Sequence, residues 1–221
     1  MRNVIVPSLA AAVEGLRNGS SLMMGGFGGA GLPRGLIRAV LDLGVRNLTV
    51  ISNNAGADPD DLSLWFRAGI VSKMICSYPR AAKEFATRYE EGSVELELVP
   101  QGTLIERIRC AGSGLGGFFT PVGVGTQLGE GKEVRVLDGR EFLLEKPLAA
   151  DFALLRGHRA DALGNITYSK TARNYSPIMA MAAETVVFEV DEVVDVGRID
   201  PECVITPCIF VDRVVQREER V

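Results

Sequence analysis

The sequence predicts an α/β fold built on an open, mostly parallel sheet with helices on both faces. Short apolar or alternating runs at residues 22–24, 48–52, 71–77 and 94–99 have the length and pattern of strands. Helical patterns separate these runs, and such alternation is typical of βαβ units and a parallel sheet. A hydrophobic content of 47% supports a substantial core. We therefore expect one domain over residues 1–221, with an inserted hairpin region.

The helices are predicted from end signals and from apolar residues at helical spacing. Ser8 is a favourable N-cap for a first helix, and Gly19 lies beyond its end. A second helix is expected over residues 33–43, because Pro33 suits a first turn and Gly44 suits a helix end. The remaining predicted helices lie at residues 61–68, 80–91, 104–110 and 176–183.

The second half of the chain contains the predicted hairpin. Asp138-Gly139 lies between two strand-like runs, 134–137 and 141–145, and this dipeptide is a strong hairpin signal. Residues 111–131 before it are rich in glycine, so we expect no packed regular element there but a linker, a lid or an interface segment. The remaining predicted strands lie at residues 151–156, 164–168, 185–190 and 209–215.

A glycine-rich stretch between the first strand and the second helix is the main candidate binding element. Five of its seven residues are glycine, which lets the backbone take positive φ and approach a ligand closely. Free N–H groups and the positive end of a helix dipole suit a phosphate or an oxyanion. The alternative is a turn that only packs the helix close to the sheet. The candidate ligand-binding residues are Gly25, Gly26, Phe27, Gly28, Gly29, Ala30 and Gly31.

The same stretch matches a dinucleotide-binding fingerprint, with Gly26, Gly28 and Gly31 at the required spacing. That fingerprint also needs an acidic residue about 20 residues later, at the end of the next strand, to hold a ribose. Here the strand is followed by the amides Asn53 and Asn54. A nicotinamide-binding oxidoreductase is therefore only a remote alternative.

Neutral amides follow the ends of two predicted parallel strands, where ligands bind in open sheets. Asn53 and Asn54 follow one strand and Gln101 follows another, and Arg80 ends a third. Amides can donate to a carbonyl or an oxyanion without bringing a charge. Plain turn chemistry is the alternative for the two asparagines. The nearby acids, at residues 58–61, lie in a predicted turn, so we expect a binding surface without a complete catalytic set.

Composition excludes several other classes. A net charge of −4 leaves no general basic field for nucleic acid. Apolar runs fall far short of the roughly 20 residues of a membrane helix, and the first residues lack a signal-peptide core, so a cytoplasmic protein is expected. The four cysteines have no C-x-x-C spacing and His158 is the single histidine, so neither a metal site nor a catalytic triad is expected.

Residues 18–33 resemble the signature of the family I coenzyme A transferases, in the α (A) subunit. The shared pattern is Asn-Gly, two residues, three apolar residues, Gly-Gly-Phe, three residues and Gly-x-Pro. Within the family, residues 76–80 and 112–119 look most like the subunits that act on 3-oxoadipate in aromatic catabolism. The resemblance extends over essentially the whole chain, through residues 48–56, 99–108, 119–126, 170–174 and 200–215.

The resemblance implies ping-pong transfer of CoA from succinyl-CoA to a 3-oxo acid through a glutamyl-CoA thioester. The nucleophilic glutamate belongs to a Glu-Asn-Gly motif of a B subunit, and this sequence contains no such motif. The family further implies that residues 25–31 bind CoA, which is a substrate and not a permanent cofactor. Asn53, Asn54 and Gln101 would line the site beside the thioester. Acetoacetate is the alternative acceptor.

Overall fold

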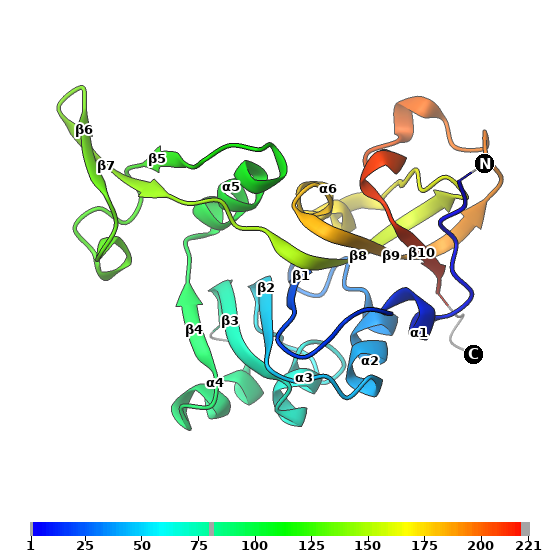
Figure 1. Ribbon diagram of the computed structural model, residues 1–221, viewed down its shortest axis with the longest axis horizontal. Coiled ribbons are helices and arrows are strands. Elements are labelled where there is room, and N and C mark those ends of the chain that lie inside the picture. Colours follow the sequence, from blue (N-terminus) through cyan, green and yellow to red (C-terminus); the bar gives the residue numbers. More distant parts are fainter. Residues whose placement is uncertain (1, 80–81, 218–221) are drawn as a thin grey trace.

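The computed structural model describes residues 2–79 and 82–217, and a seven-stranded sheet forms its centre (Figure 1). The strand order is β10-β9-β8-β1-β2-β3-β4, and every neighbouring pair is parallel. The predicted parallel α/β fold is therefore confirmed. The strands are β1 (Ser21–Met24), β2 (Leu48–Asn54), β3 (Val71–Tyr78), β4 (Glu95–Leu98), β8 (Ala150–Asp161), β9 (Ala183–Val194) and β10 (Arg213–Gln216).

Helices cover both faces of this sheet, because its strands are apolar on both sides. Leu22 and Met24 of β1 belong to one buried cluster, and Met23 between them belongs to the other. The first face packs against α1 (Leu9–Ala12), α2 (Arg34–Asp42), α3 (Ser63–Ala68) and α4 (Lys83–Glu90). The second packs against α5 (Gln101–Gly112) and α6 (Ser176–Ala180). No helix in the described ranges is long and apolar enough to cross a membrane.

Several predicted boundaries move in the structure. Asn53 and Asn54 are the last residues of β2, and Gln101 is the first residue of α5, so all three belong to regular elements. The predicted strand at 164–168 is reduced to isolated antiparallel bridges at Ile166, because residues 163–165 form a tight turn in which their backbone N–H groups donate to the Asp161 carboxylate. Short 3₁₀ helices complete the chain: η1 (Gln127–Gly129), η2 (Lys170–Arg173), η3 (Pro201–Cys203) and η4 (Cys208–Phe210).

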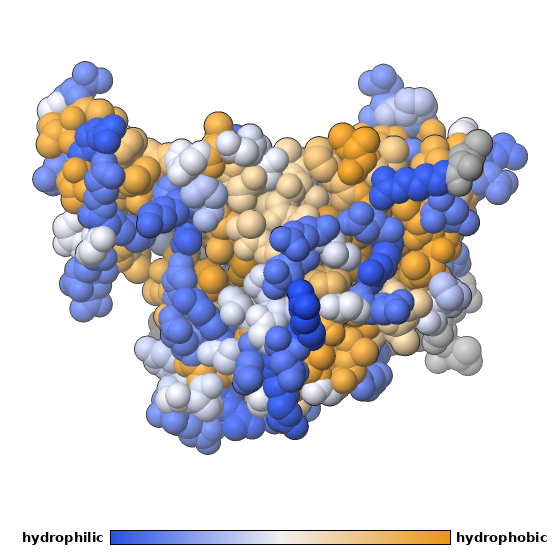
Figure 2. All heavy atoms as spheres, in the orientation of Figure 1, coloured by the Kyte–Doolittle hydropathy of each residue, from blue (hydrophilic) through white to orange (hydrophobic). Residues whose placement is uncertain are grey.

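A separate three-stranded antiparallel sheet, here called the arm, projects from the α5 side of the molecule (Figure 1). It consists of β5 (Phe118–Thr120), β7 (Arg140–Glu145) and β6 (Val134–Leu137). The predicted hairpin is confirmed, with positive φ at Asp138 and Gly139. The expectation of no regular element in residues 111–131 is wrong, since β5 pairs with β7 and η1 follows it. Hydrophobic residues are exposed to solvent on the arm (Figure 2).

Candidate functional site

The carboxyl edge of the parallel sheet gathers the polar residues that the sequence points to. Residue 25 follows β1, Asn53 and Asn54 end β2, and Gln101 begins α5 shortly after β4. Tyr175 reaches the same edge from the connection between β8 and β9. Parallel strands bring all their carboxyl ends to one side, which is why residues far apart in the sequence meet here.

Four of these side chains form a continuous hydrogen-bonded row, which we call the polar chain. Asn54 Nδ2 donates to Asn53 Oδ1 at 3.1 Å, and Asn53 Nδ2 donates to Gln101 Oε1 at 2.6 Å. Gln101 Nε2 then donates to the Tyr175 hydroxyl. Each amide nitrogen carries two hydrogens, so every amide keeps one donor beyond those used in the row. Such spare neutral donors suit a carbonyl oxygen that gains negative charge.

Tyr175 is the member that sequence reasoning missed. Burial raises the pKa of its phenol, while the hydrogen bond from Gln101 acts in the opposite direction. The phenol therefore stays protonated at neutral pH and can donate its O–H while it accepts from Gln101. Its ring also meets the exposed ring of Phe27 edge-on, with 5.9 Å between centroids. Tyr175 thus links the polar chain to the glycine-rich stretch.

The glycine-rich stretch, residues 25–31, is a tight loop, here called the glycine loop. Phe27 and Ala30 exchange both backbone hydrogen bonds at 3.0 Å, which closes the turn between them. Asn174 holds the loop from the side, since its Oδ1 accepts from Gly26 N at 3.3 Å and its Nδ2 donates to the Ala30 carbonyl at 3.2 Å. Asn174 itself adopts φ 32° and ψ −120°, which lies outside the left-handed helical region and is a combination that non-glycine residues rarely adopt.

The glycines of the loop divide into two groups. A Cβ at Gly31 would clash with the Ala172 carbonyl oxygen, and one at Gly26 would come within 2.7 Å of Leu32. A Cβ at Gly28 would meet nothing within 4 Å, and one at Gly29 would meet only Asp58 Oδ2, at 3.7 Å. The first group thus serves packing within the chain, whereas Gly28 and Gly29 face open space.

The acidic side chains near this edge are engaged in ion pairs or in hydrogen bonds to the backbone. Asp58 forms an ion pair with Arg34 at 3.2 Å, and Asp60 forms one with Arg38 at 3.1 Å. Asp61 accepts the backbone N–H groups of residues 57, 58 and 63 at 2.6, 2.9 and 2.8 Å. The polar chain contains no carboxylate, and Arg80 lies outside the described residues. These side chains can bind and polarise a carbonyl, but they supply no nucleophile.

The nearby thiol does not change this conclusion. Cys76 lies in β3 and is fully buried, and burial raises its pKa to about 12. The thiol is therefore protonated at neutral pH and is not activated as a nucleophile.

Comparison with known proteins identifies the family to which the chain is similar. Residues 6–217 match the family model described as coenzyme A transferase. The chain is 54% identical over 217 residues to the A subunit of the 3-oxoadipate CoA-transferase of Pseudomonas putida, covering 97% of this chain and 94% of the relative. It is 47% identical to the A subunit of the succinyl-CoA:3-ketoacid coenzyme A transferase of Xanthomonas campestris pv. campestris (strain B100), covering 93% and 85%.

A solved structure has the same fold. The acyl-CoA transferase YdiF of Escherichia coli O157:H7, in a thioester complex with CoA, superposes with a TM-score of 0.88 at 22% identity. The match covers 98% of this chain and spans half the length of the YdiF chain. At this identity the likeness concerns the fold alone.

Proposed function

This chain belongs to the coenzyme A transferase family, and we propose that it is the A subunit of an enzyme that moves CoA from succinyl-CoA to 3-oxoadipate. The observation that carries this choice of substrate is the 54% identity to the A subunit of a 3-oxoadipate CoA-transferase over nearly the full length of both chains. The B subunit is the partner in this proposal, and CoA thioesters are substrates that leave at the end of each cycle.

In the proposed reaction, the carboxylate of a B-subunit glutamate attacks the thioester carbonyl carbon of succinyl-CoA and expels the CoA thiolate. The thiolate then attacks the glutamyl carbonyl of the mixed anhydride, which releases succinate and leaves a glutamyl-CoA thioester. The carboxylate of 3-oxoadipate reverses these steps and leaves as its CoA thioester. Each attack places negative charge on a carbonyl oxygen, and that oxygen needs hydrogen-bond donors.

The polar chain supplies such donors in this proposal. Gln101 stands at its centre, between Asn53 and Tyr175, so its orientation is fixed by bonds on both sides. Fixed donors need little reorganisation when charge develops, and this preorganisation is the main source of their effect on rate. Asn53 and Asn54 extend the row, and Asn54 is itself held because its Oδ1 accepts from Gly56 N at 2.8 Å.

The glycine loop binds the acyl-CoA in this proposal. Support comes from Gly28 and Gly29, which face open space and leave their backbone accessible. The neighbouring loop residues are fixed by Asn174 and by close packing, so the open turn is presented on a rigid base. A thioester that lies against Gly28 would be within reach of the polar chain through the contact between Phe27 and Tyr175.

Acetoacetate is the second candidate acceptor, favoured by the 47% identity to the A subunit of a succinyl-CoA:3-ketoacid transferase. The test uses the purified complex of this chain with its B subunit, succinyl-CoA as donor and each acid as acceptor. We expect kcat/KM for 3-oxoadipate to exceed that for acetoacetate by roughly 10-fold or more, because the second carboxylate offers an additional charged contact. The reverse order would assign the complex to acetoacetate.

A further inference from the structure

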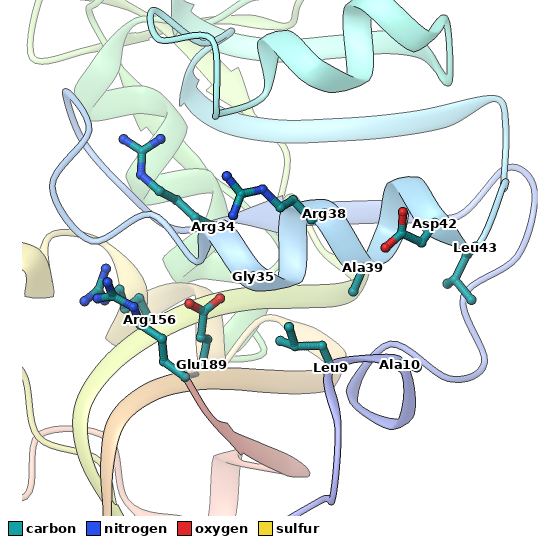
Figure 3. Close-up of a pocket in the computed structure, with 11 residues that line it drawn as sticks. Leu9, Ala10, Arg34, Gly35, Arg38, Ala39, Asp42, Leu43, Arg156 and Glu189 are labelled. Carbon is teal, nitrogen blue, oxygen red and sulfur yellow. The ribbon is translucent and has the colours of Figure 1, made fainter. Parts of the chain in front are cut away.

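A cavity of about 610 Å³ lies against α2, and no residue of the polar chain lines it (Figure 3). Glu189 of β9 points from the sheet toward Gly35 in the first turn of α2 (Figure 3). This glutamate is only 2% exposed and takes no part in the proposed reaction. The other charged residues that line the cavity are Arg34, Arg38, Asp42, Arg156 and Arg217.

Glu189 supplies a cap that α2 lacks in its own sequence. The N-cap residue Pro33 makes no side-chain hydrogen bond, so the first N–H groups of the helix need another acceptor. Glu189 Oε2 accepts the N–H of Leu36 at 3.0 Å, across 153 residues of sequence. A Cβ at Gly35 would come within 2.9 Å of the same oxygen, so the glycine allows the carboxylate to reach the helix end.

The same contact bears on the glycine loop, since α2 begins three residues after Gly31. Arg34 N donates to the Leu32 carbonyl at 3.1 Å, which joins the loop exit tightly to the first turn of the helix. The loop is therefore anchored on two sides, by Asn174 and by the start of α2. We propose that Glu189 is a positioning residue that fixes the start of α2 and thereby holds the glycine loop in the geometry that binds the acyl-CoA.

The raised pKa of Glu189 distinguishes a positioning role from a contribution to the overall free energy of folding. Burial raises the pKa of Glu189, against the opposing effects of the Leu36 and Gly35 N–H groups and of Arg156 and Arg217. The folded state therefore holds a proton on this group at higher pH than the unfolded state does. This contribution favours folding as pH falls through the raised pKa, and it is lost as pH rises through that pKa. A neutral isostere should not weaken the fold through this term.

The experiment compares Glu189→Gln with Glu184→Gln, which makes the same change at an exposed position of the same strand. Both are measured in the complex with the B subunit near pH 7.5. Glutamine keeps an oxygen at this position, but an amide oxygen is a weaker acceptor for the Leu36 N–H than a carboxylate. For Glu189→Gln we therefore expect amide hydrogen exchange in residues 25–36 to accelerate by roughly 3-fold or more, with an unchanged or raised thermal midpoint. The KM for succinyl-CoA should rise roughly 3-fold or more, with a smaller change in kcat. Glu184→Gln should match the wild type in all measurements.

Unchanged exchange in residues 25–36 of Glu189→Gln would overturn the proposal, and so would a lowered midpoint with normal kinetics. If Glu189→Gln does not fold, Glu189→Asp keeps the charge but shortens the reach to Leu36, and the same acceleration is expected. The kinetic arm rests on the proposed function, whereas hydrogen exchange needs no transferase activity. A wild-type complex that transfers no CoA would refute the proposed function and leave the exchange test of Glu189 standing.

Discussion

Gln101 holds the central place in the polar chain, because it accepts from Asn53 and donates to Tyr175. Gln101→Ala removes the donor nearest the middle of the row, and we expect kcat to fall roughly 10-fold or more. Steady-state kinetics of the complex would measure this, with Gln127→Ala on the exposed η1 turn as control. Unchanged kcat in an intact complex would reduce Gln101 to a structural residue at the start of α5.

The contribution of Tyr175 to kcat should depend on the presence of Gln101. Tyr175→Phe removes the hydroxyl that accepts from Gln101, and we expect kcat to fall by roughly 3- to 10-fold. Because the two groups are in direct contact, the double variant should lose little more activity than Gln101→Ala alone. Two independent losses that multiply in the double variant would mean that Tyr175 acts separately from the polar chain.

Two glycines of the loop allow a matched test of binding against packing. Gly31→Ala places a Cβ against the Ala172 carbonyl, so we expect it to destabilise the complex by roughly 2–4 kcal/mol. Gly28→Ala has open space and meets only the strain of positive φ, about 1–2 kcal/mol. Gly28→Ala should instead raise the KM for succinyl-CoA, and Gly28→Val should raise it further. Thermal unfolding and kinetics on the same preparations separate the two effects.

If Gly28→Val depresses the thermal midpoint and leaves the kinetics with succinyl-CoA normal, the glycine loop serves packing alone. The proposal that it binds the acyl-CoA would then have to be abandoned.

The arm is tied to the main sheet through Arg107 of α5. Its guanidinium pairs with Glu97 of β4 at 2.8 Å and lies 4.0 Å from the buried carboxylate of Glu145 in β7. Lys132 holds the other oxygen of Glu145 at 2.5 Å. We expect Arg107→Ala to lower the free energy of unfolding by roughly 2–4 kcal/mol, since it removes a cation that lies beside the buried carboxylate of Glu145.

Chemical denaturation of the purified chain measures this change. Arg109→Ala is the matched control, because Arg109 lies on the same helix and pairs with the partly exposed Glu106 at 2.8 Å. The control should change stability little. Equal effects of the two substitutions would mean that the pairing of Arg107 with the arm contributes nothing specific.

Periodicity and turn chemistry predict most of the sheet but not its full extent. The Asp138-Gly139 hairpin follows from local residue preferences alone. The strands β8 and β9 are about twice as long as their apolar runs predict. Their distal halves pair with each other beyond β1, through polar pairs such as Arg159 and Glu192. Pairing between distant strands, rather than a local pattern, decides where such strands end.

The candidate site, like the long strands, could be predicted from the sequence only where local patterns decide the structure. Asn53, Asn54 and Gln101 are predicted from strand ends, because the carboxyl edge of a parallel sheet is where such residues meet. Asn174 and Tyr175 lie 148 and 74 residues from their partners Gly26 and Gln101. A helix start at Ser176-Pro177 marks the end of their loop but does not indicate what the loop contacts. Only the tertiary fold brings these two side chains to the edge.

The assembled enzyme must obtain its nucleophile from outside this chain if the proposed function is right. The polar chain offers neutral donors, the acids at residues 58–61 are engaged in the local structure, and the Cys76 thiol is protonated. We therefore expect the isolated chain to transfer no CoA and to gain activity on mixing with the B subunit. Titration of one chain with the other, followed by steady-state rates, should reach a plateau at a fixed ratio.

The covalent intermediate gives the sharper form of this prediction. Incubation of the complex with succinyl-CoA, without acceptor, should add the mass of CoA less one water to the B subunit while this chain stays unmodified, because the thioester forms on a B-subunit glutamate. Gln101→Ala should slow the appearance of that adduct without moving it to another chain, since its amide assists the attack and does not make the bond. Intact-mass spectrometry of the two separated chains measures both outcomes. A CoA adduct on this chain, or turnover by this chain alone, would show that it carries a nucleophile and that the proposed division of the reaction between the subunits is wrong.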